Sequence, residues 1–468
     1  MPQTSASFSQ SLGIRLDGSQ SSYAPGDTII GCVYRRTPTV SPEAVVSISL
    51  CGRTKTKLVE HRNNNQANST YRGRFNIIPE DAYTQKIFQG PLHIEEFGNE
   101  QAWPFAITLP EYVDPKYVQG QDQKASFLPL NKADHVLPST FTLDTNGSTE
   151  AFVEYFLKAT VRLTGQGKTK WPEAILPFKV RNLSLDPPRA DFGLKGSKSW
   201  KYVTSYRLIP GMEEAKLSFS QKMKQSFSTS SVPEFQFHLL VDVPTVIQLD
   251  NPNPIPFRLK AVPDWTKTSE VLKDIPQQLK LTWVDIRIAI NTEVKCEGTW
   301  SSHEKLKREE VNLSVMSALF RPMQSLYIPC SDEAPPLDIG KLIDLRLGYL
   351  APGNGPSGYR FTPSFTTYNI HHSHKLNWAI KGSVAGDHFG ATGTVGLTLL
   401  MPSDERGYTD QQDPEIGGEA GGESEAGPSR LQRNESWIQP PDEDDAPPSF
   451  TEVMKEDGKA AMPEKCSN

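Results

Sequence analysis

The sequence predicts an all-β protein built from two consecutive antiparallel β-sandwich domains, followed by a disordered acidic tail. Three observations lead to this prediction. Short runs that alternate apolar and polar residues recur through residues 1–402, many of the chain's 38 prolines and 33 glycines separate these runs, and acidic residues dominate after residue 402. A chain of 468 residues is also too long for one ordinary core, which favours at least two domains.

The clearest strand lies at residues 152–163. Tyr155, Leu157 and Val161 fall on one side of an extended chain, whereas Glu154 and Lys158 fall on the other. The run is rich in β-branched and aromatic residues, and turn-forming residues bound it at both ends. We therefore expect a half-buried strand of an antiparallel sheet, with one face against a core and the other in water.

Residues 10–185 form the first predicted domain. We expect residues 52–57 to form a polar edge or loop, and the Asn-rich residues 61–74 to form a mobile connection. Besides the strand described above, alternating runs predict strands at residues 28–34, 45–50, 75–78, 103–109 and 175–180.

Residues 186–232 are predicted to be a basic linker with one short helix. Met212, Lys216, Phe219, Met223 and Phe227 recur near helical spacing in an otherwise weakly periodic stretch. We expect such a helix to dock on the neighbouring domain rather than to enter a membrane.

Residues 233–402 form the second predicted domain, and residues 403–468 form the tail. The tail contains 17 acidic and 6 basic residues and few apolar ones, so we expect it to be disordered. In the second domain, strands are predicted at residues 235–243, 279–290, 342–349, 369–381 and 394–400.

The sequence also predicts a soluble protein of the cytoplasm. No run approaches the roughly 20 apolar residues that span a bilayer, and the first ten residues resemble no secretory signal. The cysteines are odd in number, scattered and without a paired spacing, so we expect reduced thiols at Cys32, Cys51, Cys296, Cys330 and Cys466.

Three features together resemble the arrestin-related proteins, specifically the fungal arrestin-like proteins. These are the opening Tyr23-Ala-Pro-Gly-Asp27 followed by Gly31, the central run 155–159, and the segment 365–378 of the second half. The resemblance covers residues 10–402 and implies arrestin-like, immunoglobulin-like N- and C-terminal domains. It also implies a non-catalytic adaptor without cofactors, which brings a HECT-type ubiquitin ligase with WW domains to integral membrane cargo such as permeases. Ubiquitin-dependent endocytosis would follow, with the cytoplasmic protein recruited peripherally to the plasma membrane or endosomes.

The ligase-binding candidate in the tail is Pro447, Pro448 and Phe450. The family is expected to carry a Pro-Pro-x-Tyr motif there, and a WW domain reads such a motif as a polyproline II segment followed by an aromatic ring. Phe450 keeps the ring but lacks the hydroxyl, and one lost hydrogen bond costs about 0.5–1.5 kcal/mol.

A second WW-ligand candidate is the Leu-Pro-x-Tyr segment of Leu109, Pro110 and Tyr112. It directly follows a predicted strand, where we expect an ordered Tyr112 to serve packing. A separate candidate surface for anionic lipid is a cluster of six lysines in the basic linker, namely Lys195, Lys198, Lys201, Lys216, Lys222 and Lys224.

Other signals favour structure over chemistry. The glycine-rich residues 353–358 are interrupted by proline and predict a hairpin loop rather than a dinucleotide site. His371, His372 and His374 have no Cys or carboxylate at ligand spacing, so we expect sheet pairing rather than metal binding. We find no motif of a hydrolase, zinc protease or phosphate-binding loop, and predict no enzyme and no nucleic-acid partner. The alternative to the adaptor is an arrestin-fold trafficking scaffold similar to the retromer cargo subunit, without ligase recruitment.

Overall fold

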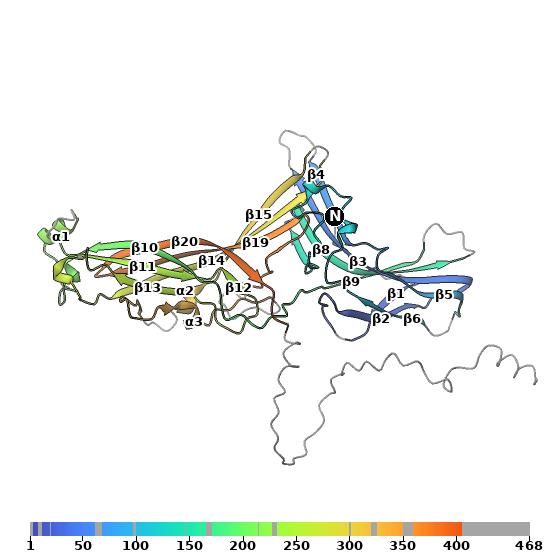
Figure 1. The fold of residues 1–468 in the computed structure, drawn as a ribbon, viewed down its shortest axis with the longest axis horizontal. Helices are drawn as coiled ribbons and strands as arrows, with labels where there is room; N and C mark the ends of the chain where they lie inside the picture. The colour runs from blue at the N-terminus through green and yellow to red at the C-terminus, as the bar shows by residue number, and fades with distance from the viewer. Residues whose placement is uncertain are drawn as a thin grey trace, which may run out of the picture. The chain divides into compact units, whose positions relative to one another are not determined.

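The fold is all-β, and it contains two consecutive antiparallel β-sandwiches (Figure 1). The structure, a computed structural model, describes residues 3–404 except 8–11, 19, 61–67, 97–99, 146, 165–170, 214, 227–231, 299–300, 320–324 and 350–358. The predicted disordered tail and the predicted hairpin loop at residues 353–358 therefore lie outside the described residues.

The first sandwich packs a three-stranded sheet on a six-stranded sheet. Ile29 and Phe105 of the smaller sheet share a buried core with Val46 and Leu157 of the larger one. The smaller sheet has the order β1 (Gly13–Leu16), β2 (Thr28–Arg35) and β6 (Gln101–Thr108). The larger sheet has the order β4 (Ser69–Ile78), β3 (Thr39–Glu60), β8 (Thr149–Leu163) and β7 (Phe141–Asp144), with β5 (Thr84–Ile94) paired to β3 and β9 (Glu173–Phe178) paired to β8.

The second sandwich packs a four-stranded sheet on a seven-stranded sheet around a core of its own. The four-stranded sheet has the order β10 (Lys195–Thr204), β11 (Glu234–Val243), β13 (Arg258–Pro263) and β17 (Leu337–Asp338). The seven-stranded sheet has the order β12 (Val246–Gln248), β20 (Asp387–Leu400), β19 (Ile370–Val384), β14 (Leu279–Cys296) and β15 (His303–Asn312), with β16 (Leu326–Ile328) on β14 and β18 (Phe365–Thr366) on β19.

Helices are few and short in the described part of the chain. The α-helices are α1 (Phe219–Ser226), α2 (Val315–Leu319) and α3 (Ile339–Leu342). The 3-10 turns are η1 (Pro115–Tyr117), η2 (Gln123–Ala125), η3 (Tyr206–Leu208) and η4 (Glu270–Leu272). The helix predicted near Phe219 and Met223 is present as α1. The prediction that it docks on the neighbouring domain through these side chains is wrong, because Phe219 is 79% exposed and Met223 is 47% exposed.

The strand predicted at residues 152–163 is present as β8, but the prediction of a face in water is wrong for its first half. Glu154 and Phe156 are only 4% and 7% exposed, so β8 is covered on both faces there. The polar side chain can be buried because cationic side chains of β3 neutralise it, as described below.

Residues 52–57, predicted as an edge or loop, instead continue β3, and residues 69–74 of the predicted connection belong to β4. Thr54, Lys55 and Thr56 are buried although they are polar. The prediction was wrong because it took these polar residues to be exposed. Lys55 and Thr56 are buried instead, with partners that the sequence does not reveal.

Residues 342–349, predicted as a strand, do not form one. The segment turns at Asp344, which has a φ of 50°, and Leu345 and Leu347 are buried in the second core. Its backbone bonds to Ile255 and Asp250 in a loop, so alternation here reflects packing rather than sheet pairing.

The predicted linker, residues 186–232, contains strand β10 in addition to α1. β10 lies at the outer edge of its sheet, where Val203 is its one buried residue, so its sequence shows little apolar alternation. The four-stranded sheet therefore begins well before the predicted boundary at residue 233.

The two sandwiches meet where β14 and the segment before β19 reach the first core. Val294, Cys296 and Tyr368 belong to the buried cluster of the first sandwich. Thr56 Oγ1 donates a hydrogen bond to the carbonyl of Lys295 at 2.6 Å, and it accepts one from Asn369 Nδ2 at 3.1 Å. One buried hydroxyl of β3 thus joins two separate segments of the second half.

The substitution Thr56→Val tests this contact. It keeps the shape of the side chain but leaves the Lys295 carbonyl and the Asn369 amide without their partner, so we expect a loss of about 2–3 kcal/mol in the free energy of unfolding. Urea denaturation measures this loss. Thr142→Val, at an exposed position of β7, is the matched control and should change stability by no more than about 0.5 kcal/mol. Equal stability of the two variants would contradict the role of Thr56.

Candidate functional site

The tail candidate, Pro447, Pro448 and Phe450, lies outside the described residues. The described chain ends at Asp404, next to a parallel bridge between Ser184 and Ser403. Pro402 accepts a backbone hydrogen bond from Ser184 at 2.8 Å, and Gln248 Nε2 donates to Ser403 Oγ at 2.8 Å. The segment that leads to the tail is therefore anchored.

The second WW-ligand candidate is part of the folded body. Leu109 is 1% exposed, and its backbone both donates to Asp27 at 2.9 Å and accepts from Gly26 at 3.1 Å. Tyr112 is 49% exposed and forms a bridge with Val136. Packing thus involves Leu109 rather than Tyr112, the residue that we expected to be packed. A WW domain would have to extract Leu109 to read this segment.

The six lysines of the lipid-surface candidate fall into two groups. Lys195, Lys198 and Lys201 lie on β10, whereas Lys216 precedes α1 and the last two, Lys222 and Lys224, lie on it. All are exposed except Lys201, which is half-buried.

The α1 group stands beside apolar side chains. Phe219 is 79% exposed and Met223 is 47% exposed, and one helical turn separates them. Lys222 lines a polar hollow of about 670 Å³ that also contains Arg207 and Asp387. This helix combines exposed apolar and cationic groups, which is the composition of a peripheral membrane contact.

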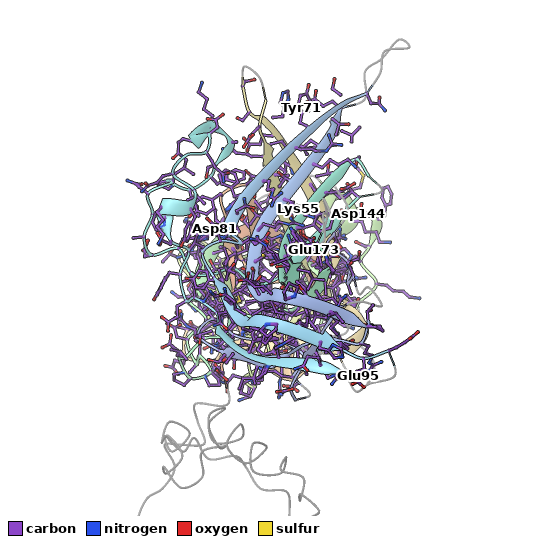
Figure 2. All side chains as sticks on the ribbon, turned by 90° about the vertical axis from the view of Figure 1, so that its right-hand side faces the viewer. Lys55, Tyr71, Asp81, Glu95, Asp144 and Glu173 are labelled. Atoms are coloured by element: carbon purple, nitrogen blue, oxygen red, sulfur yellow. The ribbon has the colours of Figure 1, made fainter. Side chains whose placement is uncertain are left out.

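A buried charged cluster in the first sandwich surrounds Glu154. Arg53 Nε and Lys55 Nζ lie 2.6 and 2.7 Å from Glu154 Oε1, and the Lys55 and Glu154 side chains are only 5% and 4% exposed. Figure 2 labels Lys55 among the strands of the first sandwich. In this view it lies below Tyr71, near the beginning of β4, and above Glu95. Burial by itself raises the pKa of the Glu154 carboxyl, but hydrogen bonds from Lys55 and Arg53 outweigh it and lower that pKa.

The N-terminal segment covers this cluster. Thr4 donates from its backbone N–H to Glu154 Oε2 and from its hydroxyl to Oε1, each at 2.8 Å. Arg53 Nη2 in turn donates to the Thr4 hydroxyl at 2.6 Å. Ser7 then exchanges two backbone hydrogen bonds with Ile175 of β9, each 2.9 Å long. The segment therefore joins the edge of the sheet and supplies two of the bonds that satisfy a buried carboxylate.

The histidines singled out in the sequence take part in sheet pairing, as predicted. His371, His372 and His374 all lie on β19, paired to β14. His372 Nδ1 lies 2.9 Å from Thr292 Oγ1, and His374 Nδ1 lies 2.9 Å from Ser364 Oγ. Within the described residues, no group of three His, Cys, Asp or Glu side chains could hold a metal ion.

Three histidines are buried where the two sandwiches meet or close to it. His135 of the first sandwich lies 3.2 Å from the carbonyl of Thr366, and its ring contacts that of Tyr368. Burial, with Lys132 nearby, lowers the pKa of His135 to about 4. Burial also lowers the pKa of His374 to about 4, and burial together with the neighbouring His374 and His371 lowers the pKa of His372 to about 3.

Sequence reasoning did not find His135 or the Glu154 cluster. A glutamate inside a run as apolar as residues 151–157 was the one available signal, because such a residue needs a buried partner. No comparable signal marked His135, whose neighbours are polar and turn-forming.

Comparison of the chain with protein-family models gives no match, and comparison with curated proteins gives none either. No helix in the described part of the chain has the length and apolar composition needed to cross a bilayer.

The buried histidines predict acid sensitivity. The pKa of His135, His372 and His374 is below the ordinary 6.5 in the folded chain, so the unfolded chain takes up protons first as pH falls. Above about pH 6.5 these histidines are neutral in both states, so protonation costs no stability there. As pH falls from there toward their folded pKa values, protonation favours the unfolded chain and stability decreases. We expect a loss of about 2 kcal/mol per histidine between pH 7 and pH 5, measured by urea denaturation.

Two variants separate this effect from general acid unfolding. His372→Phe removes one titrating group and should make stability depend less steeply on pH between 7 and 5. His93→Gln replaces an exposed histidine and should leave the pH dependence unchanged. The expectation is wrong if both variants retain the slope of the natural chain.

Proposed function

We propose that this chain is a non-catalytic adaptor of the arrestin-like type, which links membrane cargo to a HECT-type ubiquitin ligase. The observation that carries the proposal is the succession of two antiparallel β-sandwiches followed by an acidic tail with a Pro-Pro-Ser-Phe segment. The sandwiches supply surfaces for cargo and membrane, and the tail supplies a short linear ligand for the ligase. A tail of this length and composition can reach a bound ligase without disturbing the folded body.

Phe450 is the residue on which ligase recruitment depends most. A WW domain contacts the prolines through its aromatic residues and the fourth side chain through a second groove, where Phe keeps the ring contact. The missing hydroxyl is the one observation that favours the alternative function, a retromer-like trafficking scaffold of arrestin fold that recruits no ligase.

Recruitment to the membrane fits the helix α1. Phe219 and Met223 can enter the interfacial region of a bilayer, while Lys216, Lys222 and Lys224 face anionic headgroups. Such binding is weak and reversible, which suits an adaptor that visits the plasma membrane or endosomes from the cytoplasm.

The first test measures binding of the full chain to an isolated WW domain from a HECT-type ligase by calorimetry. Phe450→Tyr restores the hydroxyl and should strengthen binding by up to about 1 kcal/mol. Pro448→Ala removes part of the stiff stacking surface and should abolish measurable binding. Pro402→Ala, in the body, is the matched control and should leave the affinity unchanged.

If the Phe450→Tyr chain shows no binding, the tail is not a WW ligand. The scaffold function would then be favoured, because Leu109 of the other candidate segment is buried in the fold.

The second test measures sedimentation of the full chain with vesicles of phosphatidylcholine and phosphatidylserine. Replacing Lys216, Lys222 and Lys224 by Ser should lower the bound fraction at least about tenfold, since each lysine near an anionic surface contributes about 1 kcal/mol. Added salt should lower it in the same way. The control variant replaces Lys305 and Lys307 of exposed β15, and it should bind like the natural chain. Equal loss in both variants would contradict a specific role of α1.

A further inference from the structure

The outer edge of β10 is an open sheet edge. β10 is the first strand in the order of its sheet, and all of its residues from Lys195 to Thr204 pair with β11 in one uninterrupted register. In the described part of the chain, no strand pairs with its other side. A straight, unbulged edge of this length presents a regular row of backbone donors and acceptors.

The register shows which backbone groups point outward. Asp264 donates its N–H to the carbonyl of Gln236 at 2.9 Å, so Gln236 of β11 bonds toward β13, and the residues on either side of it bond toward β10. Their partners on β10 are Val203 and Lys201, whose N–H and C=O groups therefore face β11. The alternate residues carry the outward-facing groups, and these are Gly196, Lys198, Trp200, Tyr202 and Thr204.

Two large aromatic side chains stand next to these free groups. Trp200 is 46% exposed and Tyr202 is 56% exposed, and their rings lie 5.2 Å apart at an interplanar angle of 32°. Trp200 Nε1 donates to Gln236 Oε1 at 3.1 Å, which fixes the indole on the sheet face. Together the two rings form an ordered apolar surface on one face of the sheet. Side chains of a strand added to β10 would extend that same face.

β10 itself is a cationic strand, and the acidic residue nearest its lysines in the sheet is Asp242 of β11, which lies opposite Gly196. β10 carries Lys195, Lys198 and Lys201 and no acidic residue, and none of the three has an ion-pair partner among the described residues. The exposed edge strand β15 of the other sheet differs, because it carries glutamates such as Glu304 and Glu309 as well as lysines. Lysines alone would protect an edge from unwanted pairing, but such protection does not require an exposed Trp–Tyr pair.

We propose that β10 binds an extended acidic segment of a partner protein, which adds to the sheet as a further strand. The segment alternates apolar and acidic residues. Its apolar side chains lie over Trp200 and Tyr202, and its carboxylates lie on the other face near Lys195 and Lys201. Main-chain hydrogen bonds supply much of the affinity, and the alternation supplies specificity. The surface shares no residue with the candidate ligase-binding segment of the tail, so the inference stands or fails independently of ligase recruitment.

The test uses a fluorescent peptide as long as β10 in which glutamate and valine alternate, titrated with the full chain by anisotropy. A peptide in which lysine replaces every glutamate should bind at least about tenfold more weakly. Methylation of every second backbone nitrogen produces two further peptides. The one whose methyl groups face β10 should lose affinity at least about tenfold, whereas the other should bind like the unmodified peptide.

Variants of the protein separate charge from backbone. Lys198→Ser removes a charge but keeps the outward N–H, whereas Lys198→Pro removes both, and proline is tolerated on an edge strand at such a position. We expect the proline variant to bind about fivefold more weakly than the serine variant. Replacing Lys195 and Lys201 by Ser should weaken binding about tenfold, and replacing Lys305 and Lys307 of β15 should have no effect.

Three results would overturn the inference. The first is equal binding of the two methylated peptides, which would mean that attraction is electrostatic without strand addition. The second is a failure of the glutamate–valine peptide to bind while anionic vesicles bind in a way that requires Lys195, Lys198 and Lys201, which would assign this edge to the membrane. The third is sedimentation of the free chain as a dimer that Lys198→Pro dissociates, which would make a second copy the occupant.

Discussion

The first sandwich depends on the neutralisation of one buried carboxylate. β3 and β8 pair over fifteen residues, from Ala44 with Leu163 to Leu58 with Thr149, and this register places Arg53 directly opposite Glu154. Removing a carboxylate from water costs several kcal/mol, so Glu154 can be buried only if cations and hydrogen-bond donors reach it. A slip of one residue would move Glu154 to the apolar core face, and the ion cluster thus opposes any other register.

The same logic extends to the contact between the two sandwiches. The apolar side chains of Val294 and Tyr368 bury surface there, but polar groups determine which residues meet. The Thr56 hydroxyl satisfies groups from two segments of the second half, and His135 satisfies the carbonyl of Thr366. Polar contacts of this kind are costly when mispaired, so they select one arrangement among several that would bury similar apolar area.

Much of the fold was predictable from local alternation, and each error has a physical cause. Strands with one apolar face, such as β2, β11 and β19, were found because their periodicity records the position of a core. Residues 52–57 were missed because Lys55 and Thr56 have buried partners far away in the sequence. β10 was missed for the opposite reason, since an edge strand that buries little carries almost no periodic signal. Among the candidate residues, the lysines were recognised by charge alone, and only the structure divides them between a strand edge and a helix.

The reach of β14 and β19 into the neighbouring core has a consequence for dissecting this protein into fragments. A recombinant piece that begins at the second sandwich would leave Val294, Cys296, Tyr368 and Ile370 without the cover that residues of the first sandwich provide. A piece that ends after the first sandwich would open the same core from the other side. Each fragment would expose an apolar surface that is buried in the intact protein. Partners that bind such a fragment would do so through this surface rather than through a physiological contact. Binding sites on this protein are therefore best mapped by point substitutions in the intact body.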